Sequence, residues 1–93
     1  VVNNDQAWGM IKHSQELSIG PERLQCCELG PRPYEKMVEG LGGYGELVTR
    51  DEDIIPALER AFSSGKPACI NVITDPTVTS PATPLFYQVL KMD

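Results

Sequence analysis

The residues best suited to chemistry lie together near the start of the chain, in the polar cluster Asn3–Gln6. Asp5 offers a carboxylate and its neighbours offer amide oxygens, and Mg²⁺ takes oxygen ligands that it shares with substrate phosphates. A helical pattern begins at Trp8-Gly9-Met10, and the free N–H groups at the start of a helix bind phosphate. This turn therefore suits a cation and an anion together, although the same residue types also suit plain helix capping.

Other candidate sites carry weaker signals. His13, the single histidine, has no serine, cysteine or carboxylate in a triad-like pattern around it, so we expect a surface residue. Gly40–Gly45 matches the letters GxGxxG, but it follows a predicted helix and leads into a strand, which is not the context of a dinucleotide site. We interpret it as a helix stop and turn. The three cysteines form a poor disulfide framework and indicate reduced thiols in a cytoplasmic protein.

Strand-like and helix-like segments alternate along the first half of the chain. Val1–Asn3 has the pattern of the end of a buried strand, and Asn3–Ala7 that of a loop. The apolar spacing then predicts a helix from Trp8 to about Ser18, an irregular connection over Gly20–Pro33, and a short helix over Tyr34–Leu41.

The second half carries the clearest pattern, an amphipathic helix that Asp51 or Asp53 can cap. Its apolar stripe consists of Ile54, Ile55, Leu58 and Ala61. Glu46–Thr49 before it is a predicted strand, and Ala68–Thr74 after it is apolar enough for a parallel strand that is covered on both faces. The remaining segments are a predicted tail over Asp75–Pro84 and a last short helix over Leu85–Met92.

This order predicts an α/β fold, with a partial parallel sheet flanked by helices, for residues 1–93 and a C-terminal tail over residues 75–93. The formal net charge of -5 argues against binding to nucleic acid or to an anionic membrane surface. No apolar run approaches the ~20 residues that span a bilayer. The chain begins on a strand-like pair, from which we expect that it is part of a longer polypeptide.

The segment Val1–Ile11, with Gln15 beyond it, resembles half of the thiamine-diphosphate motif of the acetolactate synthase and 2-hydroxyacyl-CoA lyase superfamily. In that motif a Gly-Asp-Gly sequence is followed by an Asn-Asn or Asn-Asp pair. The resemblance extends through the predicted helices and strands as far as Asp75-Pro76. It implies that the fold is the C-terminal portion of a thiamine-diphosphate-binding domain, with thiamine diphosphate and Mg²⁺ as cofactors.

The resemblance leaves two registers for the metal ligands, which in the family are one side-chain oxygen and the carbonyl two residues later. Counting back from Gly9 gives Asp5 as the side-chain ligand and Ala7 as the carbonyl ligand, which we prefer. Matching the two asparagine letters instead gives Asn4 and Gln6. In either register, the resemblance implies that Ala7, Trp8, Gly9 and Met10 lie along the cofactor.

The Gly-Asp-Gly half and the family's cofactor-activating glutamate are absent, so we assign no catalytic residue and expect no activity from this chain alone. In the intact protein the resemblance implies cleavage or ligation of a C–C bond in a 2-oxo or 2-hydroxyacyl substrate. It also implies a homo-oligomer, a dimer or tetramer, because the family's active sites lie between subunits. The alternative hypothesis is a non-catalytic α/β interaction or oligomerisation module, in which Asn3–Gln6 merely caps a helix.

Overall fold

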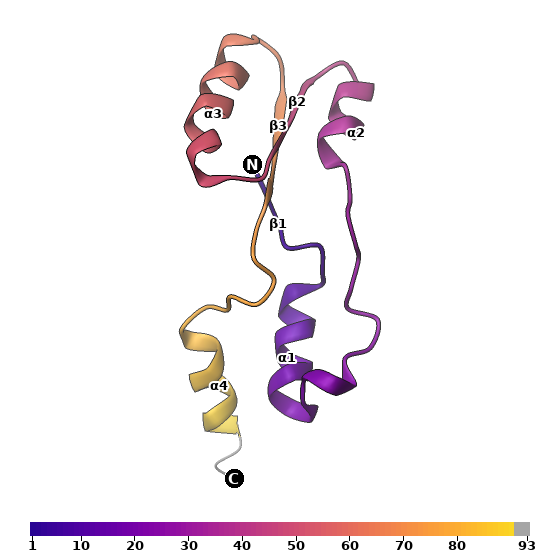
Figure 1. Cartoon of the computed structure of the whole chain (residues 1–93), viewed down its shortest axis with the longest axis vertical. Coiled ribbons are helices and arrows are strands. Elements are labelled where there is room, and N and C mark those ends of the chain that lie inside the picture. Colours follow the sequence, from indigo (N-terminus) through magenta and orange to yellow (C-terminus); the bar gives the residue numbers. More distant parts are fainter. Residues whose placement is uncertain (91–93) are drawn as a thin grey trace. The chain divides into compact units, whose positions relative to one another are not determined.

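The computed structural model describes residues 1–90, along which strands and helices alternate as predicted (Figure 1). The strands are β1 (Val2–Asn4), β2 (Tyr44–Val48) and β3 (Ala68–Ile73). The α-helices are α1 (Gly9–Ile19), α2 (Tyr34–Gly40), α3 (Ile54–Ser63) and α4 (Ala82–Leu90). Two 3₁₀ turns lie between them, at Pro21–Arg23 and Asp51–Asp53.

These elements form two compact units. Residues 1–5 and 31–74 form the sheet unit, which contains all three strands with α2 and α3. Residues 6–30 and the segment from residue 75 onward form the helical unit, which contains α1 and α4. The boundary between the units therefore falls inside the polar cluster, between Asp5 and Gln6.

The three strands of the sheet unit are parallel, in the order β1-β3-β2. Asn71 of the central strand pairs with Val2 on one side and with Leu47 on the other. Helices α2 and α3 lie on opposite sides of the sheet (Figure 1). The predicted α/β fold with a partial parallel sheet and flanking helices is confirmed.

The core of the sheet unit lies between α3 and the sheet. Val48, Ala57, Ala61 and Ile70 are its buried members, and the small alanines of α3 allow the helix backbone to approach the strands. The predicted apolar stripe of α3 is buried at Ala61 and partly buried at Ile54 and Leu58. Ile55 is 67% exposed, so the stripe is narrower than the sequence pattern indicated.

The start of α3 differs from the prediction that an aspartate side chain caps it. Asp53 occupies the position before the helix, but it has helical backbone angles and makes no capping hydrogen bond through its side chain. A capping side chain needs an extended backbone at that position. Here the Asp51–Asp53 turn runs directly into α3, and Arg50 lies 2.6 Å from Glu52 and 3.8 Å from Asp53.

The glycine-rich segment after α2 is a helix stop and turn, as predicted. Helix α2 ends at Gly40, Gly42 has a φ of 91° that favours glycine, and β2 begins at Tyr44. Gly45 follows within β2, where an added Cβ atom would clash with the carbonyl oxygen of Glu35. The glycine therefore permits α2 to pack closely on the strand.

The helical unit is organised by polar contacts to the irregular segment after α1. The Gln15 side chain donates to the carbonyl of Gln25 (3.1 Å) and accepts from its N–H (2.8 Å). Lys12 lies 3.1 Å from Glu28.

Helix α4, which contacts α1, begins at Ala82 and not at the predicted Leu85, because Ser80 accepts hydrogen bonds from the first residues of the helix. Lys91 and Met92 of the predicted helix lie outside the described residues.

Three further expectations differ in detail. Strand β1 extends to Asn4, and Val1 is 73% exposed instead of buried. Strand β2 starts at Tyr44, two residues before the predicted Glu46. The expectation of a surface histidine is wrong: the His13 side chain is 12% exposed, and its Nδ1 lies 3.4 Å from Glu16 on the next turn of α1.

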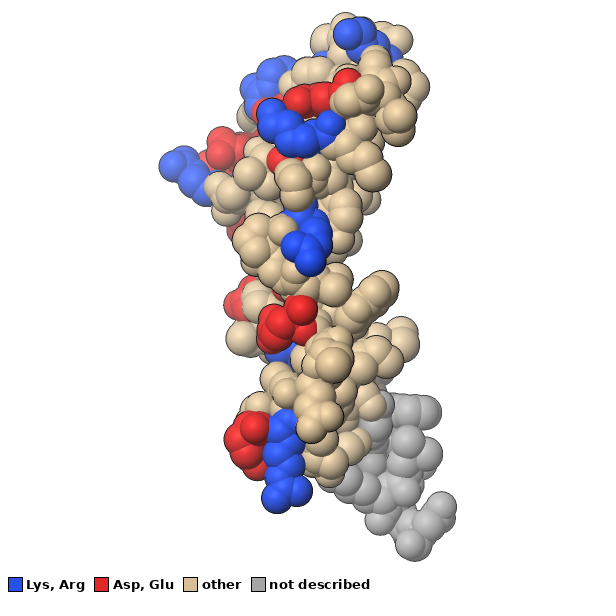
Figure 2. Space-filling view, turned by 90° about the vertical axis from the view of Figure 1, so that its right-hand side faces the viewer, with Lys and Arg blue, Asp and Glu red and all other residues tan. Residues whose placement is uncertain are grey.

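The described surface carries charges of both signs. On the face in Figure 2, lysine and arginine side chains alternate with aspartate and glutamate or stand apart on uncharged surface. No helix within residues 1–90 has the length and apolar character required to span a membrane.

Candidate cofactor site

The candidate site is the connection between β1 and α1, and its residues divide between the two units. Asn4 and Asp5 belong to the sheet unit, whereas Gln6, Ala7, Trp8, Gly9 and Met10 belong to the helical unit. The two sets are joined by the peptide bond between Asp5 and Gln6. Each set is therefore described within its own unit.

Asn4 is the last residue of β1 and is fixed at both its main chain and its side chain. Its carbonyl accepts the N–H of Thr74 at 2.9 Å. Its side-chain nitrogen lies 3.1 Å from Oδ1 of Asn71 and 3.5 Å from the carbonyl of Arg32, and the residue is 5% exposed. The amide of Asn4 is thus engaged in the interior of the sheet unit.

Asp5 follows at the carboxyl end of β1, where an open parallel sheet binds its ligands. It is half-buried, in contrast to the buried Asn4 before it. Its carboxylate is a suitable ligand for a hard cation such as Mg²⁺. Within the described residues, no three histidine, cysteine, aspartate or glutamate side chains gather as a metal site.

Gln6 and Ala7 begin the helical unit, and Ala7 pairs with Glu28 in an isolated antiparallel bridge. The carbonyl of Gln6 accepts two N–H groups, from Leu29 at 2.8 Å and from Gly30 at 3.1 Å. Gln6 has a φ of 60°, which is uncommon outside glycine and places this carbonyl against the Leu29–Gly30 segment. The N–H of Trp8 donates to the carbonyl of Cys27 at 2.7 Å, so backbone bonds on both sides of Ala7 hold the contact together.

Helix α1 begins without a side-chain cap. Trp8 occupies the position before the helix. No side chain caps the first N–H groups of α1, and the first turn of α1 contains no acidic residue. The first intrahelical bond runs from the N–H of Lys12 to the carbonyl of Trp8, at 2.8 Å. The N–H groups of Gly9, Met10 and Ile11 precede that bond, so this helix end has the donors that an anion needs.

Trp8 and Met10 are exposed, at 59% and 87%. Lys12, one turn further along α1, is only 8% exposed and pairs with Glu28. The hydrogen bond with Glu28 raises the pKa of Lys12 above its ordinary value, so the side chain is charged at neutral pH. The helix thus exposes large apolar side chains at its start and buries a cation behind them.

Sequence reasoning missed two residues next to the candidate site. Asn71 is 1% exposed and lies 2.7 Å from Oε2 of Glu35, which is 5% exposed. One signal was available: Asn71 interrupts an otherwise apolar strand. No comparable signal identified Glu35, because charged residues are common on the first turn of a helix.

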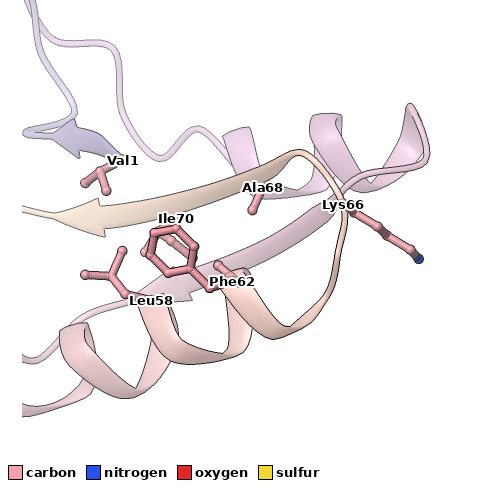
Figure 3. A pocket seen from close by; sticks show the side chains of 7 residues that line it. Val1, Leu58, Phe62, Lys66, Ala68 and Ile70 are labelled. Carbon is pink, nitrogen blue, oxygen red and sulfur yellow. The ribbon is translucent and has the colours of Figure 1, made fainter.

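One pocket of the sheet unit involves none of the predicted site residues. It is an apolar groove of about 360 Å³ between α3 and the strands, lined by Val1, Leu58, Ala61, Phe62, Lys66, Ala68 and Ile70 (Figure 3). Phe62 is one of the lining residues (Figure 3), although it is 86% exposed. Among the side chains that line the groove, only that of Lys66 is charged. The groove therefore favours an apolar occupant and does not suit a diphosphate.

Comparison with known proteins identifies related sequences over most of the chain. Residues 1–72 match the family model described as "Thiamine pyrophosphate enzyme, C-terminal TPP binding domain". The chain is 46% identical over 81 residues to the acetolactate synthase large subunit IlvG of Mycobacterium tuberculosis, which covers 87% of this chain and 15% of that protein. It is 37% identical over 79 residues to a 2-hydroxyacyl-CoA lyase of Oryza sativa subsp. japonica, which covers 82% of this chain and 14% of that protein. No solved structure gives a significant match.

Proposed function

The chain belongs to the family of C-terminal thiamine-pyrophosphate-binding domains, and we propose that its β1–α1 connection binds the diphosphate of thiamine diphosphate through Mg²⁺. When bound, thiamine diphosphate would supply the nucleophilic and electron-accepting chemistry that cleavage or ligation of a C–C bond requires. The residues of this chain contribute anchoring and orientation.

The observation that carries this proposal is the uncapped start of α1 close behind Asp5 in the sequence. The N–H groups of Gly9 and Met10 can donate to phosphate oxygens, since no side chain caps the helix. Gly9 has no side chain to obstruct a close approach. Asp5 and the carbonyl of Ala7 would hold the cation, whose remaining ligands include the diphosphate itself.

The contacts within each unit favour the Asp5/Ala7 register over the Asn4/Gln6 register. The second register needs the side-chain oxygen of Asn4, which is 5% exposed and whose side-chain nitrogen donates to Asn71, so the metal would have to reach an amide buried in the sheet unit. It also needs the carbonyl of Gln6, which already accepts two backbone N–H groups. Losing these two bonds so that the Gln6 carbonyl can bind a metal would cost about 1 kcal/mol or more for each bond.

The chain spans about 15% of the length of the acetolactate synthases that it matches. We propose that it is part of a longer enzyme that cleaves or forms a C–C bond in a 2-oxo or 2-hydroxyacyl substrate. The exposed apolar groove beside β1 supports further polypeptide or a second subunit packing there. The free cysteines Cys26, Cys27 and Cys69 support a cytoplasmic location.

Calorimetric titration of the intact protein with thiamine diphosphate, with and without Mg²⁺, tests the cofactor proposal. We expect Mg²⁺-dependent binding that Asp5→Ala weakens by more than about 10-fold, because it removes a direct ligand. Glu59→Ala, at an exposed position of α3, is the matched control and leaves binding unchanged.

Two results would contradict the proposal. Unchanged affinity in both Asp5→Ala and Asn4→Ala would exclude the β1–α1 connection as the metal site. Absence of any Mg²⁺-dependent binding to the intact protein would instead favour a non-catalytic interaction module.

A further inference from the structure

A chain of buried side-chain hydrogen bonds connects α2 through the central strand to the end of β1. Glu35 accepts from the side-chain nitrogen of Asn71 at 2.7 Å, and Oδ1 of Asn71 accepts from the side chain of Asn4 at 3.1 Å. The nitrogen of Asn71 also donates to the carbonyl of Arg32 at 3.0 Å. All four residues belong to the sheet unit, and the three whose side chains take part are 1–5% exposed.

The direction of these bonds follows from Glu35. The side-chain nitrogen of Asn71 donates to its carboxyl oxygen, so the amide oxygen of Asn71 faces Asn4 and accepts from it. This fixes the orientation of the Asn4 amide. Burying these polar side chains costs desolvation free energy that an apolar core does not cost. The hydrogen bonds offset this cost only while every buried donor and acceptor has a partner.

The consequence for the candidate site comes from the position of Asn4. Its side chain is held by Asn71 and its carbonyl by the N–H of Thr74 at 2.9 Å, so β1 ends in one fixed conformation. Asp5 leaves the sheet from that point. We propose that Asn71 and Glu35 are positioning residues, which set the direction of Asp5 toward the metal through Asn4.

This inference rests on the proposed function, because it needs Asp5 as a ligand. Residues that orient metal ligands without touching the metal typically change the affinity for that metal by about 10–100-fold when they are replaced. A residue that only stabilises the fold does not change the affinity of molecules that remain folded. The two roles are therefore separable by measuring Mg²⁺ affinity well below the unfolding temperature.

The test uses the intact protein at saturating thiamine diphosphate and titrates Mg²⁺ in a set of variants. Asn71→Asp places two carboxylates side by side and removes the donor to Glu35, so we expect Mg²⁺ affinity to fall by about 10–100-fold. Glu35→Gln alone keeps an acceptor for Asn71, and we expect it to change little. In the double variant that combines Asn71→Asp with Glu35→Gln, the new amide on α2 donates to the new carboxylate, which still accepts from Asn4. We expect this double variant to recover most of the lost affinity.

Controls separate positioning from stability. Ile70→Val on the same strand and Glu46→Gln on β2 should lower the unfolding temperature and leave the hydrogen bonds between Glu35, Asn71 and Asn4 in place. We expect unchanged Mg²⁺ affinity in both. If Asn71→Asp does not fold, Asn71→Ser provides a shorter side chain that cannot bridge Glu35 and Asn4.

Unchanged Mg²⁺ affinity in folded Asn71 variants, with a loss in Asp5→Ala, would overturn the positioning role and leave the cofactor proposal intact. Equal losses in the Ile70→Val control and the Asn71 variants would also overturn it. If the unchanged protein does not bind thiamine diphosphate with Mg²⁺, the proposed function itself fails.

Discussion

Lys12 Nζ and Glu28 Oε1 lie 3.1 Å apart in an ion pair with one buried and one exposed partner. The side chain of Lys12 is 11% exposed and that of Glu28 is 62% exposed. The pair connects α1 to the segment 27–30, which also forms backbone hydrogen bonds with Gln6 and Trp8. It therefore helps to hold the start of α1 in place.

Replacement of Glu28 by glutamine should destabilise the helical unit modestly. The exposed carboxylate is screened by water, so we expect a loss of about 1 kcal/mol in the free energy of unfolding at pH 7. The hydrogen bond with Glu28 raises the pKa of Lys12 above 10.5, so the contribution is full below pH 10.5 and is lost as pH rises through the raised value. Urea unfolding of the chain at pH 7 and at increasing pH above 10.5 measures this.

The Lys12→Met background provides the control for that measurement. Methionine keeps the apolar stem and removes the ammonium, so adding Glu28→Gln should then cost little. An equal loss in both backgrounds would show that Glu28 stabilises the unit by a route other than the ion pair.

Glu46 of β2 joins Arg60 of α3 and Tyr44 in a second charged group. Its carboxylate accepts from Nε of Arg60 at 3.1 and 3.2 Å, and the Tyr44 hydroxyl donates to it at 2.7 Å. The hydrogen bonds from Arg60 lower the pKa of Glu46 below its ordinary value of 4.5. Because the folded-state pKa is lowered, the stabilisation is present above pH 4.5 and is lost as pH falls through the lowered value.

Glu46→Gln should accordingly reduce stability at pH 7 and have almost no effect at pH 2. Arg60 is 53% exposed, so water screens the pair and we expect only a small loss at pH 7. Urea unfolding followed by circular dichroism across this pH range measures the difference. Glu59→Gln, on the same helix, should show no such pH-dependent difference. A loss for Glu46→Gln that is constant from pH 2 to pH 7 would contradict the ion-pair explanation.

The fold was predictable where local patterns decide it. Helix α3 carries its apolar residues at helical spacing, and the apolar run of β3 is typical of a central parallel strand. The failures occur where tertiary contacts decide. The predicted cap by Asp51 or Asp53 is absent because the turn before α3 adopts helical angles, and His13 is largely buried although its sequence neighbours are polar.

The candidate site was predictable only as a segment. The sequence identified the Asn3–Gln6 cluster, but not that the buried Asn4 side chain bonds to Asn71, 67 residues away. It equally could not show that Gln6 uses its carbonyl for Leu29 and Gly30. These pairings depend on the way distant segments meet, and residue spacing contains no such information.

Gly45 allows close packing of α2 on β2, and its replacement by alanine should be strongly destabilising. The new Cβ would overlap the carbonyl oxygen of Glu35, which is backbone and cannot rotate away. We expect a loss of about 1–3 kcal/mol or more, because α2 must move. That movement also displaces Glu35 from Asn71, so Gly45→Ala should weaken Mg²⁺ binding in the intact protein as well.

Gly40→Ala is the matched control, five residues earlier in the chain. A Cβ there meets no atom within 4 Å, and Gly40 is the last residue of α2, without a positive φ. Alanine restricts the unfolded chain and suits a helix, so we expect a gain of about 0.4–1 kcal/mol. Urea unfolding of both variants gives opposite shifts of the midpoint if helix packing at Gly45 is the cause. Equal shifts in the same direction would mean that α2 does not pack tightly on β2 at Gly45. The position of Glu35, and with it the hydrogen bonds through Asn71 to Asn4, would then not depend on this packing.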